Sequence, residues 1–272
     1  MRRLGQRPRA SILLLAYRSE STIGIAARSA LRQTVRDLEL IIVGDGVDEG
    51  TRAVALQLAA EDRRVRFLDF PKGANRGETH RDVAVGKARS DAILYLADDD
   101  ILLPTHVENL LELLDHANFV QSSNGYINAN NELELFPADL ADPACIAWHL
   151  VDPPQNAVSI TGTGHSLAFY RALDRHWDLT PHGIWTDLHM WRAFMVHPDF
   201  RGATSAEMTT LQFPASVHGH RSEADMAAMM AGWDEFSRRP GVGIRMAALL
   251  SQAQLRYRRP WIANEFDSKP EP

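Results

Sequence analysis

Residues 94–104 read Leu-Tyr-Leu-Ala-Asp-Asp-Asp-Ile-Leu-Leu-Pro, a short apolar run that ends in three adjacent carboxylates and then leads to a proline. The apolar residues 92–96 are typical of a strand that is buried on both faces. Pro104 favours the start of a helix, because the N–H that proline lacks would be unpaired at the first helical position. The carboxylates are therefore expected between a buried strand and a helix.

Three further apolar runs precede this one, at residues 10–17, 38–43 and 65–68. Amphipathic segments lie between or after the runs, with apolar residues at helical spacing over residues 23–31 and 107–114. This alternation predicts an α/β fold, with a mostly parallel central sheet that is flanked by helices and joined by right-handed crossovers.

The pattern changes after residue 116. Residues 119–136 predict a strand and hairpin with a turn at Asn130 and Asn131, and a short helix is expected over residues 144–150. Residues 162–165, Gly-Thr-Gly-His, are expected to form a loop that approaches a ligand closely, and residues 187–196 an amphipathic helix.

The expected domain organisation follows from these patterns. We expect one domain over residues 1–221, with a ligand-binding half up to residue 115 and a second half from residue 116. A helical extension is predicted over residues 222–272, ending in a disordered tail from residue 267. Its apolar stripe from Met226 to Trp233 is expected to pack in the core, although peripheral contact with a membrane is left open.

Composition excludes several classes of protein. The 272 residues are 45% hydrophobic and 24% charged, as in an ordinary globular protein. With 29 basic and 35 acidic residues the net charge is −6, which argues against a nucleic-acid partner. The single cysteine, Cys145, fits a reducing compartment, and no apolar stretch approaches the roughly 18 residues of a membrane span. A cytoplasmic location is therefore expected.

Polar residues at strand ends are the candidate ligand-binding residues, because an open parallel sheet binds ligands beyond the carboxyl ends of its strands. Asp45 follows the second strand, where its carboxylate could accept a hydrogen bond from a nucleotide base or ribose. Asp98, Asp99 and Asp100 would repel one another without a cation, and their hard oxygens suit Mg²⁺ or Mn²⁺ together with a diphosphate. A solvated acidic loop is the alternative. Arg81 enters a predicted helix, where a guanidinium suits phosphate oxygens.

Several motifs together resemble family 2 glycosyltransferases, which have the GT-A fold and use nucleotide-diphospho-sugars. The resemblance covers residues 10–115 and is weaker beyond. It rests on the motifs at residues 11–17 (Ser-Ile-Leu-Leu-Leu-Ala-Tyr), 29–34 (Ser-Ala-Leu-Arg-Gln-Thr), 38–46 (Leu-Glu-Leu-Ile-Ile-Val-Gly-Asp-Gly), 75–77 (Asn-Arg-Gly), 80–82 (His-Arg-Asp) and 94–104.

The resemblance implies roles for individual residues. The nucleotide would be bound by Ala16, Tyr17, Asp45, Arg81, Asp98 and Asp99, and a Mn²⁺ or Mg²⁺ ion by Asp99, Asp100 and one of His218 and His220. Either Asp99 or Asp100 would be the principal metal ligand. The family commonly has Pro-Thr before the tyrosine and Asn after it, where this chain has Leu15, Ala16 and Arg18, and its acidic motif often begins at the position of Ala97.

Asp187 is the candidate catalytic base, because residues 185–191 (Trp-Thr-Asp-Leu-His-Met-Trp) resemble the acidic motif of the family at the start of a helix. An ordinary acid in the first turn of a helix is the alternative. The implied activity is metal-dependent, inverting transfer of a sugar from a nucleotide-diphospho-sugar, first of all a UDP-sugar, to a hydroxyl acceptor that is a glycan, a lipid-linked molecule or a small molecule. Residues 1–115 would then bind the nucleotide-sugar, and residues 116–221, with the loop at residues 162–165, would lie on the acceptor side.

Two other functions stay open at this point. A sugar nucleotidyltransferase also combines acidic residues with a metal, but it normally has a glycine-rich loop after the first strand, where this chain has no glycine until Gly24. A non-catalytic homologue that only binds nucleotide or glycan would need none of the catalytic acids.

Overall fold

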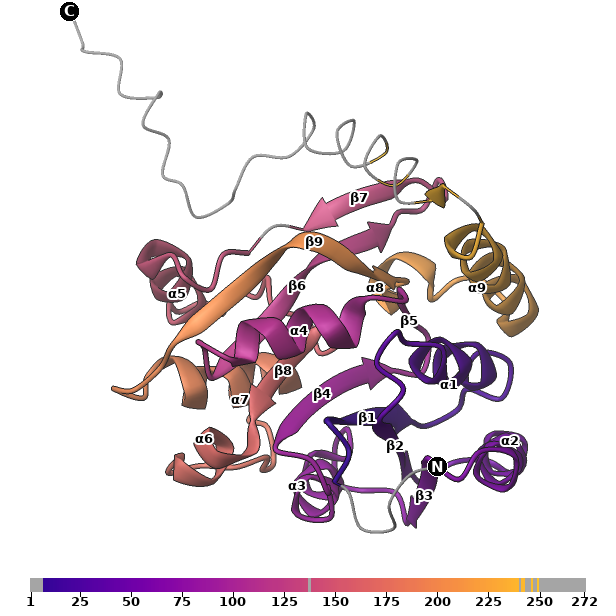
Figure 1. The fold of residues 1–272 in the computed structure, drawn as a ribbon, viewed down its shortest axis with the longest axis horizontal. Helices are drawn as coiled ribbons and strands as arrows, with labels where there is room; N and C mark the ends of the chain where they lie inside the picture. The colour runs from indigo at the N-terminus through magenta and orange to yellow at the C-terminus, as the bar shows by residue number, and fades with distance from the viewer. Residues whose placement is uncertain (1–6, 137, 240, 243–245, 247–248, 250–272) are drawn as a thin grey trace, which may run out of the picture.

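A twisted sheet with helices on both faces forms the fold (Figure 1). The computed structural model describes residues 7–136, 138–239, 241, 242, 246 and 249. Within these residues the strands are β1 (Ala10–Ala16), β2 (Leu38–Asp45), β3 (Val65–Phe70), β4 (Ala92–Ala97), β5 (Ile101–Leu102), β6 (Phe119–Ile127), β7 (Leu133–Phe136), β8 (Thr163–Ser166) and β9 (Gly202–Gln212). The helices are α1 (Ile23–Leu31), α2 (Glu49–Glu61), α3 (Glu78–Gly86), α4 (His106–Leu114), α5 (Pro143–His149), α6 (Leu167–Ala172), α7 (Thr186–Met195), α8 (Ala215–His218) and α9 (Glu223–Ser237).

The strands follow the order β3-β2-β1-β4-β8-β6-β9-β5, and β7 pairs with β6. The first four strands of this order are parallel. Strand β8 then pairs antiparallel with both β4 and β6, while β6 and β9 are parallel. The predicted α/β fold is confirmed, with its continuous parallel part at the β3–β4 end. The expected loop at residues 162–165 is wrong, because Thr163–Ser166 is strand β8.

Both faces of β1, β2 and β4 are buried, which explains their apolar runs, whereas β3 lies at the edge of the sheet and is only partly buried. On β1, Ile12 and Leu14 pack into one core cluster together with α1, α2 and α4. Leu13 lies on the opposite face and packs into a second cluster with α3, α6 and α7. Successive side chains of a strand point to opposite faces, so a strand between two helical layers is apolar throughout.

The predicted elements of the second half are present. Strands β6 and β7 form the hairpin, with Asn131 in its turn at a φ of 62°. Helix α5 covers the expected short helix, and α7 begins at Thr186, one residue before the predicted start.

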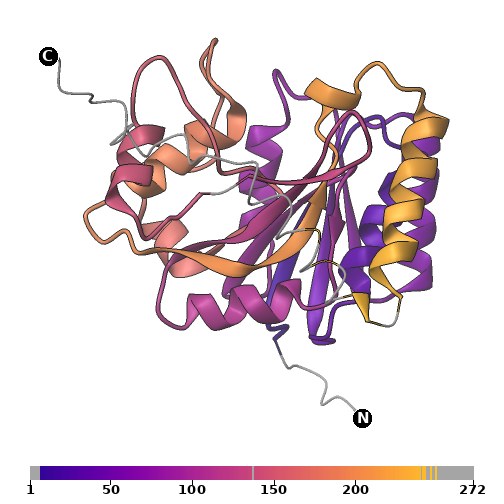
Figure 2. The ribbon, with the colours of Figure 1, turned by 90° about the horizontal axis from the view of Figure 1, so that it is seen from above.

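Helix α9 packs back onto the domain, beside α1 (Figure 2). Met230 is fully buried in a third core cluster, against which Met226, Met229 and Trp233 pack. An ion pair between Arg32 and Asp234 joins α1 to α9. The predicted packing of the methionine stripe in the core is confirmed, while the expected tail from residue 267 lies outside the described residues. Among the residues that the structure describes, no helix is long and apolar enough to cross a bilayer.

Candidate active site

The carboxyl ends of β1, β2 and β4 meet at one edge of the sheet. Strand β1 lies between the other two, with Ala16 opposite Gly44 on β2 and Leu15 opposite Ala97 on β4. The residues that follow these strands are therefore neighbours, and the backbone N–H of Tyr17 donates to Oδ2 of Asp98 at 3.0 Å. The structure thus brings together the loops that carry Tyr17, Asp45 and the acidic cluster, which we define as Asp98, Asp99 and Asp100.

Asp45 holds the loop between β3 and α3 in place. Its Oδ2 accepts from Nζ of Lys72 at 2.7 Å, and its Oδ1 accepts from the backbone N–H of Gly73 at 2.6 Å. The same ammonium lies 5.4 Å from the ring centroid of Tyr17, whose side chain is 41% exposed. An exposed aromatic face and an anchored carboxylate thus border one space at the edge of the sheet.

Two glycines allow these loops to approach closely. Gly46 has a φ of +66°, and a Cβ atom there would lie 2.7 Å from the Cα atom of Lys72. Gly77 has a φ of +73°, and its Cβ would lie 3.0 Å from the Cβ of Asp45. Both positions need a left-handed backbone and have no room for a side chain, so glycine is the residue that fits.

The three carboxylates of the acidic cluster differ in the hydrogen bonds that they accept from other residues. Asp98 accepts from Tyr17, as described, and Oδ1 of Asp100 accepts from the backbone N–H of Phe213 at 2.9 Å. Asp99 accepts no hydrogen bond from another residue within the described part of the chain. Burial raises the pKa of all three carboxyls, that of Asp100 to about 6, and the neighbouring charges of Asp100 and Asp98 raise the pKa of Asp99 further.

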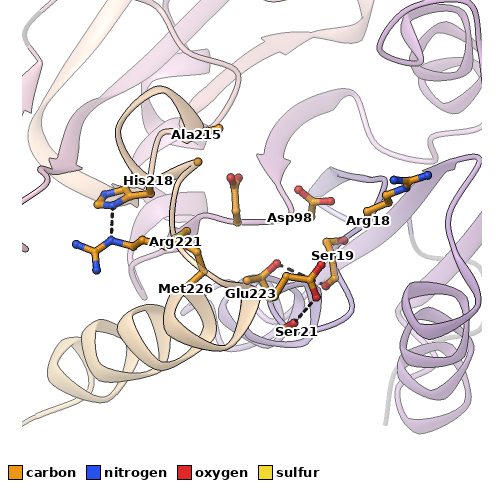
Figure 3. A pocket seen from close by; sticks show the side chains of 12 residues that line it. Arg18, Ser19, Ser21, Asp98, Ala215, His218, Arg221, Glu223 and Met226 are labelled. Atoms are coloured by element: carbon orange, nitrogen blue, oxygen red, sulfur yellow. Dashed lines mark hydrogen bonds between the residues drawn. The ribbon is translucent and has the colours of Figure 1, made fainter.

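A cavity of about 190 Å³ opens beside the acidic cluster. It is lined by Arg18 and Ser19 from the loop after β1, by Asp98 and Asp99, and by residues of the α8–α9 segment that include His218 and Arg221. Figure 3 shows the two loops on either side of Asp98. Guanidinium groups can hold an anion and carboxylates can hold a cation, so this cavity can hold the two ions together.

The two histidines predicted as metal ligands have different surroundings. His218 is buried, its Nε2 donates to the carbonyl of Ile127 at 2.8 Å, and its Nδ1 accepts from Nε of Arg221 at 3.1 Å. Metal ligation by His218 would therefore require the loss of one of these bonds. His220 is exposed. This arrangement favours the carboxylates over the histidines as ligands, and a role for either histidine stays a prediction.

A second cavity, of about 250 Å³, contains the candidate base. We call it the Asp187 cavity, and its lining comprises Arg76, Arg81, Ile160, Ile184, Trp185, Thr186 and Asp187. Oδ1 of Asp187 accepts from Nδ2 of Asn156 at 3.2 Å, and burial of the carboxylate raises its pKa. Leu188 and Trp191 are fully buried, so they anchor the first turns of α7 and fix the position of Asp187.

Arg81 is the cation of this cavity and is only 8% exposed. Its guanidinium lies 4.8 Å from the ring of Trp177, and its Nη2 donates to the carbonyl of Arg76 at 2.9 Å. Its Nε has no partner among the described residues. Burial lowers the pKa of Arg81, whereas the charges of Glu78, Asp187 and Asp45 act in the opposite direction. Arg81 therefore lies within electrostatic reach of both Asp187 and Asp45.

Residues 11–146, half of the chain, match the model of glycosyl transferase family 2. The chain belongs to this family. The matched region contains β1 to β4, the acidic cluster and Arg81, whereas Asp187 lies beyond it.

Curated relatives of this family 2 chain match over shorter regions. A UDP-Glc:α-D-GlcNAc-diphosphoundecaprenol β-1,3-glucosyltransferase of Escherichia coli is 28% identical over 132 residues, which are 47% of this chain and 50% of the relative. An uncharacterized glycosyltransferase of Haemophilus influenzae is 26% identical over 120 residues, 44% of this chain and 47% of the relative. The chain thus spans about half the length of these two relatives.

The fold is shared with a solved structure. Residues 1–349 of S. aureus TarS superpose with a TM-score of 0.58 and 14% identity, over 85% of this chain and 72% of that one. The same fragment in complex with UDP-GlcNAc gives a TM-score of 0.58 and 13% identity, over 91% and 72%. At this level of identity the likeness shows the fold alone.

The candidate site of this family 2 chain also contains residues that the sequence patterns do not predict. Trp177 donates from Nε1 to the hydroxyl of Tyr95 at 2.9 Å, and that hydroxyl donates in turn to Nε2 of His165 at 2.8 Å. Trp177 thereby stays fixed beneath Arg81. No local pattern marks Trp177, because its role depends on packing between distant segments. Lys72 was also not predicted, although its position shortly after a strand would have marked it as a candidate ligand-binding residue.

Proposed function

We propose that this chain transfers a sugar from a UDP-sugar to a hydroxyl acceptor, with a divalent metal ion and with inversion at the anomeric carbon. The observation that carries the proposal is that Arg81 lines one cavity with Asp187 and also lies within electrostatic reach of Asp45, at the nucleotide side. A donor that extends from Asp45 to Asp187 has its diphosphate and its sugar between these two carboxylates.

The donor side offers one partner for each part of a nucleotide diphosphate. The exposed ring of Tyr17 provides a face on which a base can stack. Asp45 keeps lone pairs for a base N–H or a ribose hydroxyl beside its bonds to Lys72 and Gly73. Arg81 and Arg18 supply positive charge for phosphate oxygens. The E. coli relative named for UDP-Glc and the UDP-GlcNAc complex of TarS support a uridine nucleotide.

The acidic cluster fits a Mg²⁺ or Mn²⁺ ion, held by Asp99 and Asp100. Its carboxylates are hard oxygen donors with raised pKa values, which a nearby cation would lower again. The described residues contain no group of three or more His, Cys, Asp or Glu side chains placed to hold a metal. Diphosphate oxygens would therefore complete the ligand shell, as is common for Mg²⁺. When bound, such an ion neutralises negative charge on the leaving diphosphate.

Asp187 acts as the general base. An acceptor hydroxyl is a poor nucleophile at neutral pH, so its proton must be removed as the new C–O bond forms. The carboxylate of Asp187 accepts this proton, while the bond between the anomeric carbon and the diphosphate oxygen breaks on the opposite side. Arg81 stabilises the charge that develops on the departing oxygen. A single displacement of this kind inverts the anomeric configuration.

Product analysis with UDP-, GDP- and dTDP-sugars, with Mn²⁺, Mg²⁺ or EDTA, tests the proposal. We expect UDP release and a glycosidic product of inverted configuration by NMR, and loss of both with EDTA. Pyrophosphate release would indicate a nucleotidyltransferase, and binding without turnover a non-catalytic homologue. A retained configuration would contradict the single displacement.

Calorimetry tests the metal site separately. UDP should bind more tightly with Mn²⁺ than with EDTA, and this difference should disappear in Asp99→Ala and Asp100→Ala. UDP affinity that responds neither to EDTA nor to these substitutions would refute the assignment of the acidic cluster.

A further inference from the structure

Trp185 is an exposed aromatic residue at the Asp187 cavity. Its side chain is 54% exposed, whereas Trp177 and Trp191 are buried in the core at 3% and 0%. When a ligand covers a large apolar ring that was exposed to water, the burial of this surface favours binding. Because Trp185 lines the same cavity as Asp187, a ligand that covers the ring also lies near the base.

The lining of this cavity matches the two kinds of surface that a sugar ring presents. Trp185, Ile184 and Ile160 provide apolar surface, and Arg81 and Asp187 provide charged hydrogen-bonding groups. A pyranose has a face of C–H groups that packs against an aromatic ring, and equatorial hydroxyls that require hydrogen-bond partners. A small alcohol has too little C–H surface to use the indole.

The backbone holds Trp185 in a fixed position. The carbonyl of Trp185 accepts from the N–H of His189 in the first turn of α7 at 2.9 Å. The preceding loop is tied to the donor side, because Nδ2 of Asn75 donates to the carbonyl of Thr180 at 3.2 Å. With the backbone positioned in this way, only the side-chain torsions of Trp185 lose freedom when a ligand binds.

We propose that Trp185 is the stacking platform for a pyranose ring of the acceptor, and hence that the acceptor of this enzyme is a saccharide. The inference rests on the proposed function, since it assigns the second substrate of that reaction. The ring lies against the indole, and one of its hydroxyls reaches the carboxylate of Asp187, two residues further along the chain.

The kinetic test uses Trp185→Ala, Trp185→Phe and the control Leu179→Ala, with UDP-glucose and UDP-GlcNAc as donors. Leu179 is 53% exposed on the same loop but is not part of the cavity lining. With methyl glucosides and methyl N-acetylglucosaminides as acceptors, Trp185→Ala should lower kcat/KM about 10- to 100-fold, mainly through KM. Trp185→Phe should retain most of the activity, and Leu179→Ala should equal the wild type. Glycerol and ribitol as acceptors, and the affinity for UDP, should not respond to Trp185→Ala.

Binding provides a second readout that does not depend on turnover. The ¹⁵N-indole resonance of Trp185, assigned by its absence in Trp185→Phe, should shift when a methyl glycoside is added to the UDP-bound protein, and should not shift with glycerol. Absence of this shift, or unchanged saccharide kinetics in Trp185→Ala, overturns the inference. The proposed function fails in a different way, if the wild type neither binds UDP nor consumes a UDP-sugar.

Discussion

Asp187 combines two properties of a general base, a fixed position and a raised pKa. Its carboxylate is held by Asn156 at the start of a helix anchored in the core. General base catalysis typically contributes about 10²- to 10⁴-fold to the rate. We expect Asp187→Asn to lower kcat by this factor, measured at saturating UDP-sugar, while calorimetry shows unchanged affinity for UDP. Asp199→Asn, which changes an exposed aspartate just beyond the same helix, is the control and should have wild-type kcat. Near wild-type turnover of Asp187→Asn would exclude this residue as the base.

The raised pKa of Asp187 also predicts the pH dependence of the reaction. As the proposed base, Asp187 would act only when it is deprotonated, so kcat is expected to fall as the pH drops through its pKa. Because burial raises that pKa, activity should be lost at a higher pH than the value of about 3.9 at which an ordinary aspartate titrates. Initial rates at saturating substrates between pH 4 and pH 8 measure this acid limb. A profile that stays flat down to pH 4 would contradict the assignment.

At the scale of elements, the N-terminus of α3 depends on a left-handed glycine. Gly77→Ala places a Cβ atom 3.0 Å from the Cβ of Asp45 and forces alanine into a φ of +73°. A left-handed backbone costs a non-glycine residue about 1–2 kcal/mol. The free energy of unfolding in urea should fall by at least this amount, and UDP should bind more weakly because Asp45 is displaced.

Gly86, at the other end of α3, provides the matched control. A Cβ atom there meets nothing within 4 Å, and its φ lies outside the left-handed region. Gly86→Ala should therefore leave UDP affinity unchanged and keep or slightly raise stability, since it reduces the entropy of the unfolded chain. Equal losses of stability in both variants would show that the close approach of Gly77 to Asp45 is unimportant.

The sequence predicts those elements whose signal is local. Strands β1, β2 and β4 are recognisable because burial on both faces makes them largely apolar. Since ligands bind beyond the carboxyl ends of parallel strands, Asp45 and the acidic cluster are then expected at one edge of the sheet. Strand β8 carries only four residues, Thr-Gly-His-Ser, and is a strand because β4 and β6 pair with it from both sides. Trp177 and Lys72 were missed for a related reason, since their contacts depend on where other segments pack.

At the scale of the whole molecule, buried histidines make stability depend on pH. Burial lowers the pKa of His106 to about 3 and of His165 to about 4, from an ordinary value of 6.5. Below pH 6.5 the unfolded chain binds these protons and the folded chain does not. The free energy of unfolding therefore falls with decreasing pH, by up to about 1.4 kcal/mol per pH unit for each histidine, until the pH reaches the folded pKa.

Urea unfolding of the wild type and His106→Phe between pH 6 and pH 4.5 measures this effect. The variant should be less stable overall, because Thr209 loses its partner, but its stability should fall less steeply with pH. In both proteins the acidic cluster changes the free energy of unfolding with pH in the direction opposite to that of the histidines. The difference between the two slopes therefore reports His106. Identical slopes would show that His106 takes up its proton without unfolding.

The pairing of β8 with β4 limits how this family 2 chain can be recombined with its relatives. A cut near residue 115, where the apolar pattern changes, would expose the edge of β4 and remove Trp177 from beneath Arg81. An unpaired edge of a buried strand is a template for aggregation. A chimera that exchanges acceptor preference should therefore keep β8 and Trp177 with the donor half, and exchange only the short segment 178–185 that carries Trp185.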